Sequence, residues 1–261
     1  MNNILMALIA TTVTWAVTAL GSALVIFFKK PEERLLNCCL GFAAGVMIAA
    51  SFWSLLEPAV EHAENVLKIS PYFIVTTGFL LGALFMWFTD KTVKSLNQSN
   101  NFNISVNRKL FVLVSSITLH NIPEGFAVGI AFGALNENRS AEALMCAVTT
   151  AIGIAIQNFP EGAAISLPLR GSGFSRKNSF LIGQASAIVE PIFGVIGAVI
   201  VSTVSKILPF ALSFAAGTMI TVAVHELIPE CQNNKSQNEY LSTVFIILGF
   251  SIMTLLDVML G

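Results

Sequence analysis

Long apolar runs, separated by short polar gaps, constrain this chain more than any other feature of its sequence. A helix needs about 20 apolar residues, at 1.5 Å of rise each, to cross the hydrocarbon core of a bilayer. Runs of that size occur eight times, at residues 4–28, 35–58, 72–90, 109–135, 141–169, 178–204, 207–229 and 240–260. The pattern predicts an all-α integral membrane protein in which residues 1–261 form a single polytopic domain of eight transmembrane helices.

Composition agrees with a membrane location. Hydrophobic residues make up 55% of the chain and charged residues only 11%, against about 25% charged residues in soluble domains. The 14 basic and 15 acidic residues nearly cancel, so nothing favours binding to nucleic acid. The four cysteines show no CxxC spacing and are expected to be packing residues; they are Cys38, Cys39, Cys146 and Cys231.

The longest polar gap, residues 91–108, contains the string NQSNNFN and shows no apolar periodicity. A segment of that composition buries too little apolar surface to fold by itself. We therefore expect a flexible loop, which the orientation below assigns to the cytoplasm.

Basic residues set the expected orientation, because cytoplasmic loops of membrane proteins are enriched in Lys and Arg. With the N-terminus outside, the cytoplasmic side receives Lys29, Lys30, Arg34, Lys91, Lys94, Arg108, Lys109, Arg170, Arg176, Lys177 and Lys235. The opposite side keeps only Lys68, Arg139 and Lys206. This asymmetry predicts that both termini lie outside.

One short string occurs twice. Residues 42–48 read FAAGVMI and residues 214–220 read FAAGTMI. In the topology above, the two helices that carry these strings cross the membrane in opposite directions. That arrangement is typical of an inverted-topology repeat in a transporter, although chance similarity between two apolar strings is the alternative. Pairs of glycines spaced as GxxxG, at 41/45, 78/82 and 129/133, predict close approach of helix backbones.

Two polar motifs interrupt consecutive apolar segments, HNIPEG at 120–125 and QNFPEG at 157–162. Residues three and four apart share one face of a helix, so each motif presents amide and carboxylate groups together. A charged side chain in the middle of a bilayer costs about 2.5–3.5 kcal/mol or more. If the two helices pack side by side, Glu124 and Glu161 would repel each other unless a divalent cation or shared protons lay between them.

Two further features support a polar cavity at these motifs. Pro123 and Pro160 each remove a backbone N–H, and in lipid the freed carbonyl groups need another partner. Glu190, in the string SAIVEPIFG of the next apolar segment, has no basic residue near it in sequence. A cation shared with the two motifs would neutralise it, whereas a protonated structural glutamate is the alternative. Imidazole, carboxylate and amide donors suit Zn, Fe, Mn, Co or Cd.

HNIPEG and QNFPEG in consecutive helices, followed by AxxEP in the next, resemble the signature of the ZIP family of metal transporters, in particular its GufA-like branch. The resemblance extends over essentially the whole chain. It implies a first metal position formed by Met47, His120, Glu124, Gln157 and Glu161. It implies a second position formed by Asn121, Glu124, Asn158, Glu161 and Glu190, with Ser54 nearby and with both glutamates of the motifs bridging this binuclear-type site.

The same resemblance implies a homodimer, an eight-helix bundle with a 3+2+3 inverted-repeat plan, and alternating access by an elevator-like movement of helices one, four, five and six. Two departures from the family pattern stand out. Asn158 occupies a position where some relatives carry Asp, which removes one negative charge, so permanent occupation of the second position is not expected. The gap 91–108 contains no histidine, so capture of metal by that loop is not expected.

Two weaker clusters lie near segment ends. Glu57, Glu61, His62 and Glu64 lie towards the outer end of the second segment, where they either attract cations or form a solvated helix end. His225, Glu226 and Glu230 lie towards the inner end of the seventh segment, and we interpret them as a metal exit station, with a hydrated helix end as the alternative. The string HELIP is not a zincin motif, because HExxH requires histidine where Pro229 stands. Asp90 and Asp257 receive no role.

The sequence therefore predicts a non-enzymatic transporter that moves Zn²⁺, or Fe²⁺, Mn²⁺, Co²⁺ or Cd²⁺, into the cytoplasm. It needs no ATP, because no GxxxxGK[ST] motif occurs, and it uses no catalytic cofactor. Two alternatives remain open, a metal-dependent membrane hydrolase and a proton-coupled carrier of another ion. The short connections favour a bacterial inner membrane.

Overall fold

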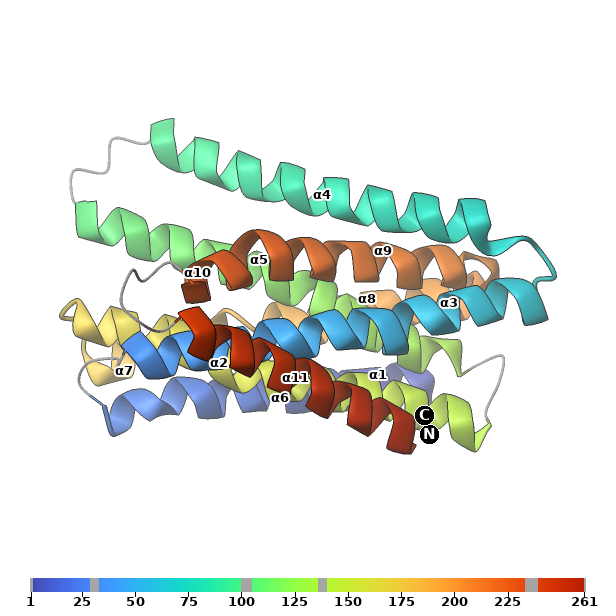
Figure 1. The fold of residues 1–261 in the computed structure, drawn as a ribbon, viewed down its shortest axis with the longest axis horizontal. Helices are drawn as coiled ribbons and strands as arrows, with labels where there is room; N and C mark the ends of the chain where they lie inside the picture. The colour runs from blue at the N-terminus through green and yellow to red at the C-terminus, as the bar shows by residue number, and fades with distance from the viewer. Residues whose placement is uncertain (1, 29–32, 100–104, 136–139, 233–238, 261) are drawn as a thin grey trace.

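The computed structural model describes residues 2–28, 33–99, 105–135, 140–232 and 239–260. Four basic residues of the orientation argument, Lys29, Lys30, Arg139 and Lys235, lie outside these ranges. The described residues form helices and no strand. The longer helices run along one axis of the bundle, and α1 begins at the same end of it as α11 ends (Figure 1). We call this the terminal end.

The helices that form the bundle are α1 (Asn3–Ser22), α2 (Glu33–Ala50), α3 (Glu57–Glu61), α4 (Pro71–Ser99), α5 (Ser105–Ala134), α6 (Ala141–Gly171), α7 (Arg176–Ala185), α8 (Val189–Thr203), α9 (Leu208–Val222), α10 (Ile228–Gln232) and α11 (Glu239–Leu260). Short 3₁₀ turns extend α1 over Ala23–Ile26 and precede α9 over Ser205–Ile207. Serine side chains cap α6 and α7, where Ser140 and Ser175 accept from the backbone N–H groups of Ala143 and Asn178.

Seven helical segments within the described residues are long and apolar enough to cross a membrane. They are Asn3–Ile26, Glu33–Val66, Pro71–Thr92, Ala143–Gly171, Arg176–Thr203, Leu208–Gln232 and Tyr240–Leu260. The expectation of an all-α membrane protein is confirmed. The predicted span 109–135 lies in α5, which is a helix of 30 residues but is not among the seven.

Helices extend well into the predicted loop 91–108. Helix α4 continues to Ser99 and α5 begins at Ser105. Within the predicted loop, only residues 100–104 lie outside the described part of the chain. The hydroxyl of Thr92 donates to the carbonyl of Phe88 at 2.7 Å, and Nζ of Lys91 lies 4.9 Å from the ring centroid of Trp87. Polar residues can extend a helix beyond the apolar span in this way, because a long basic side chain packs its methylene groups over apolar surface.

The predicted segment 178–204 is not one helix. It breaks at residues 186–188, between α7 and α8. Pro191 has no N–H to donate to the carbonyl of Ala187 four residues earlier. That carbonyl instead accepts from the N–H of Glu190 at 3.0 Å, which tightens the turn. The break therefore lies directly before Glu190.

Wide π-helical turns, which the sequence gave no reason to expect, follow both copies of the repeated string. In the second segment they occupy Ser51–Leu56 and His62–Val66, so the helical path runs beyond the predicted end at 58. In the seventh segment a π-helical turn occupies Ala223–Leu227, between α9 and α10. Such turns occur often at functional sites because they rotate the side chains that follow.

Close backbone contacts join these helices in pairs, as the GxxxG spacing predicted. A Cβ on Gly45 of α2 would overlap the carbonyl oxygen of Ile246 in α11. A Cβ on Gly217 of α9 would overlap the carbonyl oxygen of Phe79 in α4 in the same way. Gly45 and Gly217 occupy the same position in the two repeated strings, and α2 and α9 run in opposite directions (Figure 1).

Candidate metal-ion site

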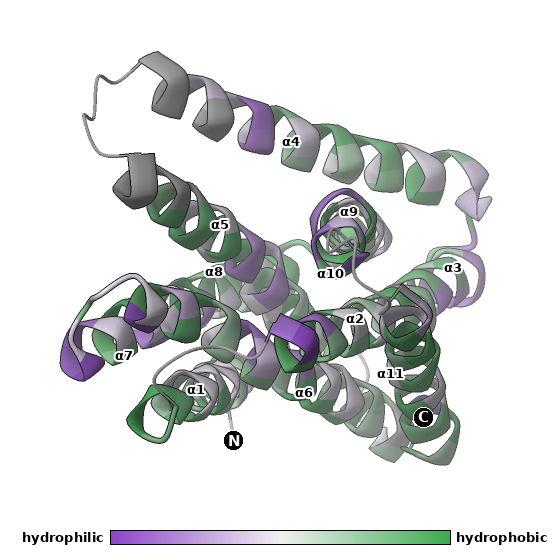
Figure 2. Cartoon of the chain, turned by 60° about the vertical axis from the view of Figure 1, so that its left-hand side comes forward, coloured by the Kyte–Doolittle hydropathy of each residue, from purple (hydrophilic) through white to green (hydrophobic). Residues whose placement is uncertain are grey.

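The two polar motifs lie in the middle of α5 and α6, which pack against each other. Both helices continue through their internal prolines, Pro123 and Pro160. Figure 2 shows hydrophilic turns of α5 where it passes through the middle of the bundle. The six polar residues of the two motifs are at most 2% exposed; they are His120, Asn121, Glu124, Gln157, Asn158 and Glu161. We refer to these six residues, together with Glu190, as the central cluster.

A hydrogen bond connects the two motifs. Nε2 of Gln157 donates to Oε1 of Glu124 at 2.5 Å. Glu161 lies one turn after Gln157 on α6, and Asn158, the residue after Gln157, donates to Glu190. Three carboxyl groups from three helices thus share one buried region, where like charges are costly without a cation or a proton.

The third carboxyl group comes from the first turn of α8. Nδ2 of Asn158 donates to Oε1 of Glu190 at 2.8 Å and to its Oε2 at 3.0 Å. The hydroxyl of Thr14 in α1 donates to Oε2 as well. Because the helix break brings Glu190 to the start of α8, its side chain reaches both α1 and α6.

Many polar atoms of the central cluster have no hydrogen-bond partner within the described protein, although buried polar groups are normally paired. Apart from Nε2 of His120, which lies close to Glu226 as described below, they are Nδ2 and Oδ1 of Asn121, Oε2 of Glu124, Oε1 of Gln157, Oδ1 of Asn158, and both carboxylate oxygens of Glu161. Six of these seven atoms are oxygens. Hard and borderline divalent cations bind through such oxygens.

The imidazole of His120 points elsewhere. Its Nε2 lies 2.9 Å from Oε1 of Glu226, on the π-helical turn after α9, and the hydroxyl of Ser116 donates to Oε2 of the same carboxylate. The histidine therefore connects the central cluster, to which it belongs, with Glu226.

Two further residues of the predicted set come from the second segment. Met47 is buried on α2 and belongs to the apolar core. Ser54 is also buried, and its hydroxyl donates to Oδ1 of Asp257 in α11 at 2.9 Å. Neither residue takes part in the hydrogen bonds of the central cluster described above.

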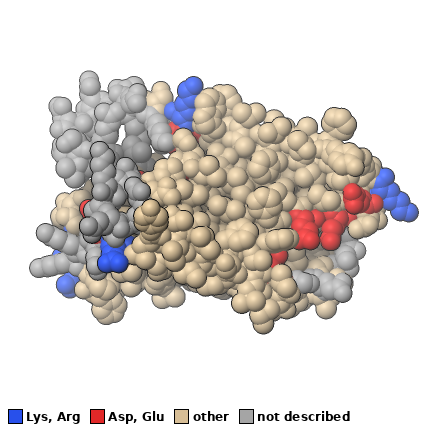
Figure 3. All heavy atoms as spheres, in the orientation of Figure 1, with Lys and Arg blue, Asp and Glu red and all other residues tan. Residues whose placement is uncertain are grey.

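A cavity of about 620 Å³ opens at the terminal end of the bundle, between the π-helical turn Ser51–Leu56, α3, α5, α6, α9 and α11. Its polar lining includes Ser54, Glu57, Glu61, His62 and Asp257. Glu64, predicted to belong with them, is exposed and lies outside the lining. Figure 3 shows acidic side chains gathered at this end of the molecule, over the region of α3.

At the opposite end, the expected trio of His225, Glu226 and Glu230 is divided. Nε2 of His225 lies 3.3 Å from Oδ2 of Asp90 in α4, and Glu226 contacts His120. Glu230 is exposed. Asp90 and Asp257, to which the sequence assigned no role, therefore each bind a polar residue of a π-helical turn.

Comparison with known proteins agrees with this geometry. The sequence model described as ZIP Zinc transporter matches residues 101–257, which include both motifs and Glu190. The chain belongs to the ZIP zinc transporter family. It is 37% identical to human Zinc transporter ZIP11, over all of this chain and 98% of that protein. It is 35% identical to Zinc transporter ZIPB of Bordetella bronchiseptica (95% and 79% covered) and 30% identical to Zinc transporter GufA of Myxococcus xanthus (97% and 98% covered).

Membership of the ZIP family, together with the seven apolar helices, makes the chain a multi-pass membrane protein of a transporter family and not of an enzyme family. The resemblance to its GufA-like branch is confirmed. Divalent metal ions are the substrates of this family, with zinc the foremost.

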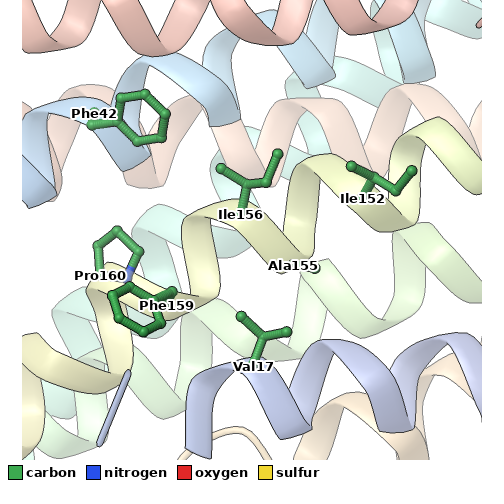
Figure 4. Close-up of a pocket in the computed structure, with 7 residues that line it drawn as sticks. All are labelled: Val17, Phe42, Ile152, Ala155, Ile156, Phe159 and Pro160. Atoms are coloured by element: carbon green, nitrogen blue, oxygen red, sulfur yellow. The ribbon is translucent and has the colours of Figure 1, made fainter. Parts of the chain in front are cut away.

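A second cavity of this ZIP protein has no polar lining. It measures about 480 Å³ and lies between α1, α2 and α6, where Figure 4 shows Val17, Phe42, Ile152, Ala155, Ile156, Phe159 and Pro160. Only the carbonyl and N–H groups of the backbone could offer polar contacts there. This cavity is therefore no candidate for the metal site.

Carboxamides set the character of the central cluster in this ZIP protein. In the described part of the chain, no three side chains of the types His, Cys, Asp and Glu are grouped to hold an ion. Asn121, Gln157 and Asn158 supply neutral oxygens beside two carboxylates that lack full pairing. The two negative charges of the carboxylates balance the charge of one divalent cation, and the carboxamides add ligands without adding charge. A transport site needs such moderate binding because it must also release its ion.

Sequence reasoning missed Thr14, Ser116, Asp90 and Asp257. One available signal was the spacing of Thr11, Thr14 and Thr18 in the first apolar segment, which lines one face of a helix. All three are buried in the ZIP protein. The partners of the other three residues are brought close only by packing between helices distant in sequence.

Proposed function

We propose that this protein transports divalent transition-metal cations, zinc foremost, into the cytoplasm through the central cluster. One observation carries the proposal: unpaired carboxylate and carboxamide oxygens of α5 and α6 lie buried in the middle of the helix bundle. Leaving such groups without partners in an apolar interior is costly. A divalent cation in transit supplies both the charge and the ligation that they lack.

The proposed site has two positions that share Glu124 and Glu161. The first adds Gln157, with His120 and Met47 joining when the imidazole turns away from Glu226. The second adds Asn121, Asn158 and Glu190. The hydrogen bonds from Gln157 to Glu124 and from Asn158 to Glu190, made by neighbouring residues of α6, support a common site.

The proposed path begins at the terminal end and finishes at the opposite end. Glu57, Glu61, His62 and Asp257 line the cavity at the terminal end, where an acidic surface raises the local concentration of cations. Beyond the central cluster, Glu226 and His225 would receive the ion, with Glu230 at the surface. The contact between His120 and Glu226 supports this order.

The proposed topology has eight spans with both termini outside. Two observations support it: α1 begins and α11 ends at one end of the bundle (Figure 1), which requires an even number of crossings, and α5 is long enough to be the eighth crossing. The matching contacts of Gly45 and Gly217 support an inverted repeat on a 3+2+3 plan. The elevator-like movement, the homodimer and the bacterial inner membrane remain predictions of the resemblance and of the short connections.

Uptake of radioactive zinc into proteoliposomes tests the proposal. We expect Glu124→Ala and Glu161→Ala each to reduce uptake to the level of empty liposomes, because each removes a charge that both ion positions share. Glu64→Ala is the matched control, since Glu64 is exposed and lies outside the cavity lining. Near-normal uptake by both central variants, inserted in equal amounts, would refute the site.

The same vesicles separate the remaining alternatives. A proton-coupled carrier of another ion would acidify dye-loaded vesicles without accumulating zinc. A metal-dependent hydrolase would cleave its substrate in detergent, where transport is impossible. Zinc accumulation that depends on Glu161 favours the transporter over both.

A further inference from the structure

The three buried glutamates of the central cluster differ in how many of their carboxylate oxygens accept hydrogen bonds from the protein. Both carboxylate oxygens of Glu190 accept hydrogen bonds. Glu124 has one bonded oxygen and one without a partner in the described protein. Glu161 has no partner for either oxygen there. The need for a cation therefore increases from Glu190 to Glu124 to Glu161.

Thr14 is the residue outside the two motifs that contributes to this difference. It is 1% exposed, on the face of α1 that packs against α6 and α8. Its hydroxyl contacts both Glu190 and the carbonyl of Thr11, and its own carbonyl accepts from Nδ2 of Asn158 at 3.3 Å. Thr14 therefore fixes the carboxylate and the carboxamide of the second ion position at once.

Hydrogen bonds to a charged carboxylate are stronger than neutral ones, and a cation that binds the same carboxylate draws its charge away and weakens them. A carboxylate that already has donors on both oxygens therefore gains less from a cation than a carboxylate without donors. In addition, Asn158 turns its donor nitrogen towards Glu190, so its oxygen would have to turn before both residues could ligate one ion.

We propose that Thr14 is a positioning residue that makes ion binding stepwise. It holds Glu190 in a satisfied state, so a first ion binds between Glu124 and Glu161 and a second ion binds at Glu190 with much lower affinity. This inference rests on the proposed function. It means that a residue of α1, Thr14, limits how many ions the central cluster binds at a time.

Zinc titration of the purified protein in detergent, with the bound metal counted after equilibrium dialysis, tests the inference. We expect one tight ion per chain in the unchanged protein. Thr14→Val keeps the shape of the side chain and removes its hydroxyl, and it should tighten the second ion by roughly tenfold or more, as the loss of one charge-assisted bond implies. Thr14→Ser should restore the original isotherm.

Two further variants serve as controls. Thr11→Val removes a neighbouring buried hydroxyl whose bonds go to carbonyls of α1 itself, so its isotherm should be unchanged. Glu190→Gln should abolish the second ion and keep the first. Thermal unfolding of each variant shows whether it is folded, and Thr14→Ala replaces Thr14→Val if the valine is not tolerated.

Two equally tight ions in the unchanged protein would overturn the inference. A folded Thr14→Val or Thr14→Ala variant with the original isotherm would overturn it too. The proposed function fails separately, if zinc binding persists unchanged when Glu124 and Glu161 are both replaced by glutamine. In that case the ions bind outside the central cluster, whatever Thr14 does.

Discussion

The side-chain amide of Gln157 donates to Oε1 of Glu124 at 2.5 Å, and this bond joins the motif of α6 to the motif of α5. It leaves Oε1 of Gln157 and Oε2 of Glu124 without partners in the described protein. One interhelical hydrogen bond thus orients two oxygens that an ion can share.

Replacing Gln157 by leucine should therefore impair ion binding more than folding. The variant Gln157→Leu removes a donor to Glu124 and a neutral ligand together, and we expect zinc uptake to fall by roughly tenfold or more, since each lost charge-assisted bond is worth about 1.5–3 kcal/mol. Gln184→Leu is the control, because Gln184 donates to the carbonyl of Leu181 in its own helix. Uptake rates in proteoliposomes make the comparison, and equal rates for the two variants would contradict the prediction.

Replacing Asn158 by aspartate should strengthen the second ion position. The change Asn158→Asp removes the amide that donates to Glu190 and adds a negative charge beside it. We expect two tightly bound ions per chain instead of one, counted by elemental analysis after dialysis. The same metal stoichiometry in the variant and in the unchanged protein would count against this prediction.

Replacing Ser116 by alanine should slow the passage of ions beyond the central cluster. The Ser116 hydroxyl holds one oxygen of Glu226 while His120 contacts the other. In Ser116→Ala the carboxylate of Glu226 loses the hydrogen bond that positions it against the imidazole of His120. We therefore expect the maximal rate of uptake to fall several-fold with little change in KM. Thr118→Val provides the control, since the hydroxyl of Thr118 donates to the carbonyl of Val114 in its own helix. A change confined to KM would argue that Ser116 acts on binding instead.

Adding a methyl group at Gly45 should destabilise the bundle. Its Cβ would overlap the backbone of Ile246, which cannot move without shifting α11. Overpacking of this kind costs roughly 1–3 kcal/mol, so Gly45→Ala should unfold at a clearly lower temperature in detergent. At Gly153 the added Cβ would instead meet the flexible end of the Met253 side chain. Equal melting temperatures for Gly45→Ala and Gly153→Ala would show that the contact between α2 and α11 is not close.

Local features of the sequence predicted most helices and the face that each motif presents. Hydropathy located the spans, because a long apolar segment in a bilayer must form a helix to satisfy its own backbone hydrogen bonds. Spacing placed the polar groups of each motif on one helix face, because residues three and four apart share a face. Glu124 and Glu161 were therefore expected to meet if the two helices packed side by side. The predicted loop 91–108 was wrong, because α4 and α5 extend into it. The predicted span 178–204 holds as a candidate crossing, but a turn at residues 186–188 interrupts its helix.

Contacts between distant segments needed the tertiary structure. Thr14 and Glu190 are 176 residues apart, and nothing in the order of residues shows that α1 turns its threonines towards α8. The direction of His120 towards Glu226, and the pairing of Ser54 with Asp257, depend likewise on how far each helix is rotated about its axis. Sequence periodicity determines which residues share a face of one helix, whereas packing against its neighbours determines where that face points.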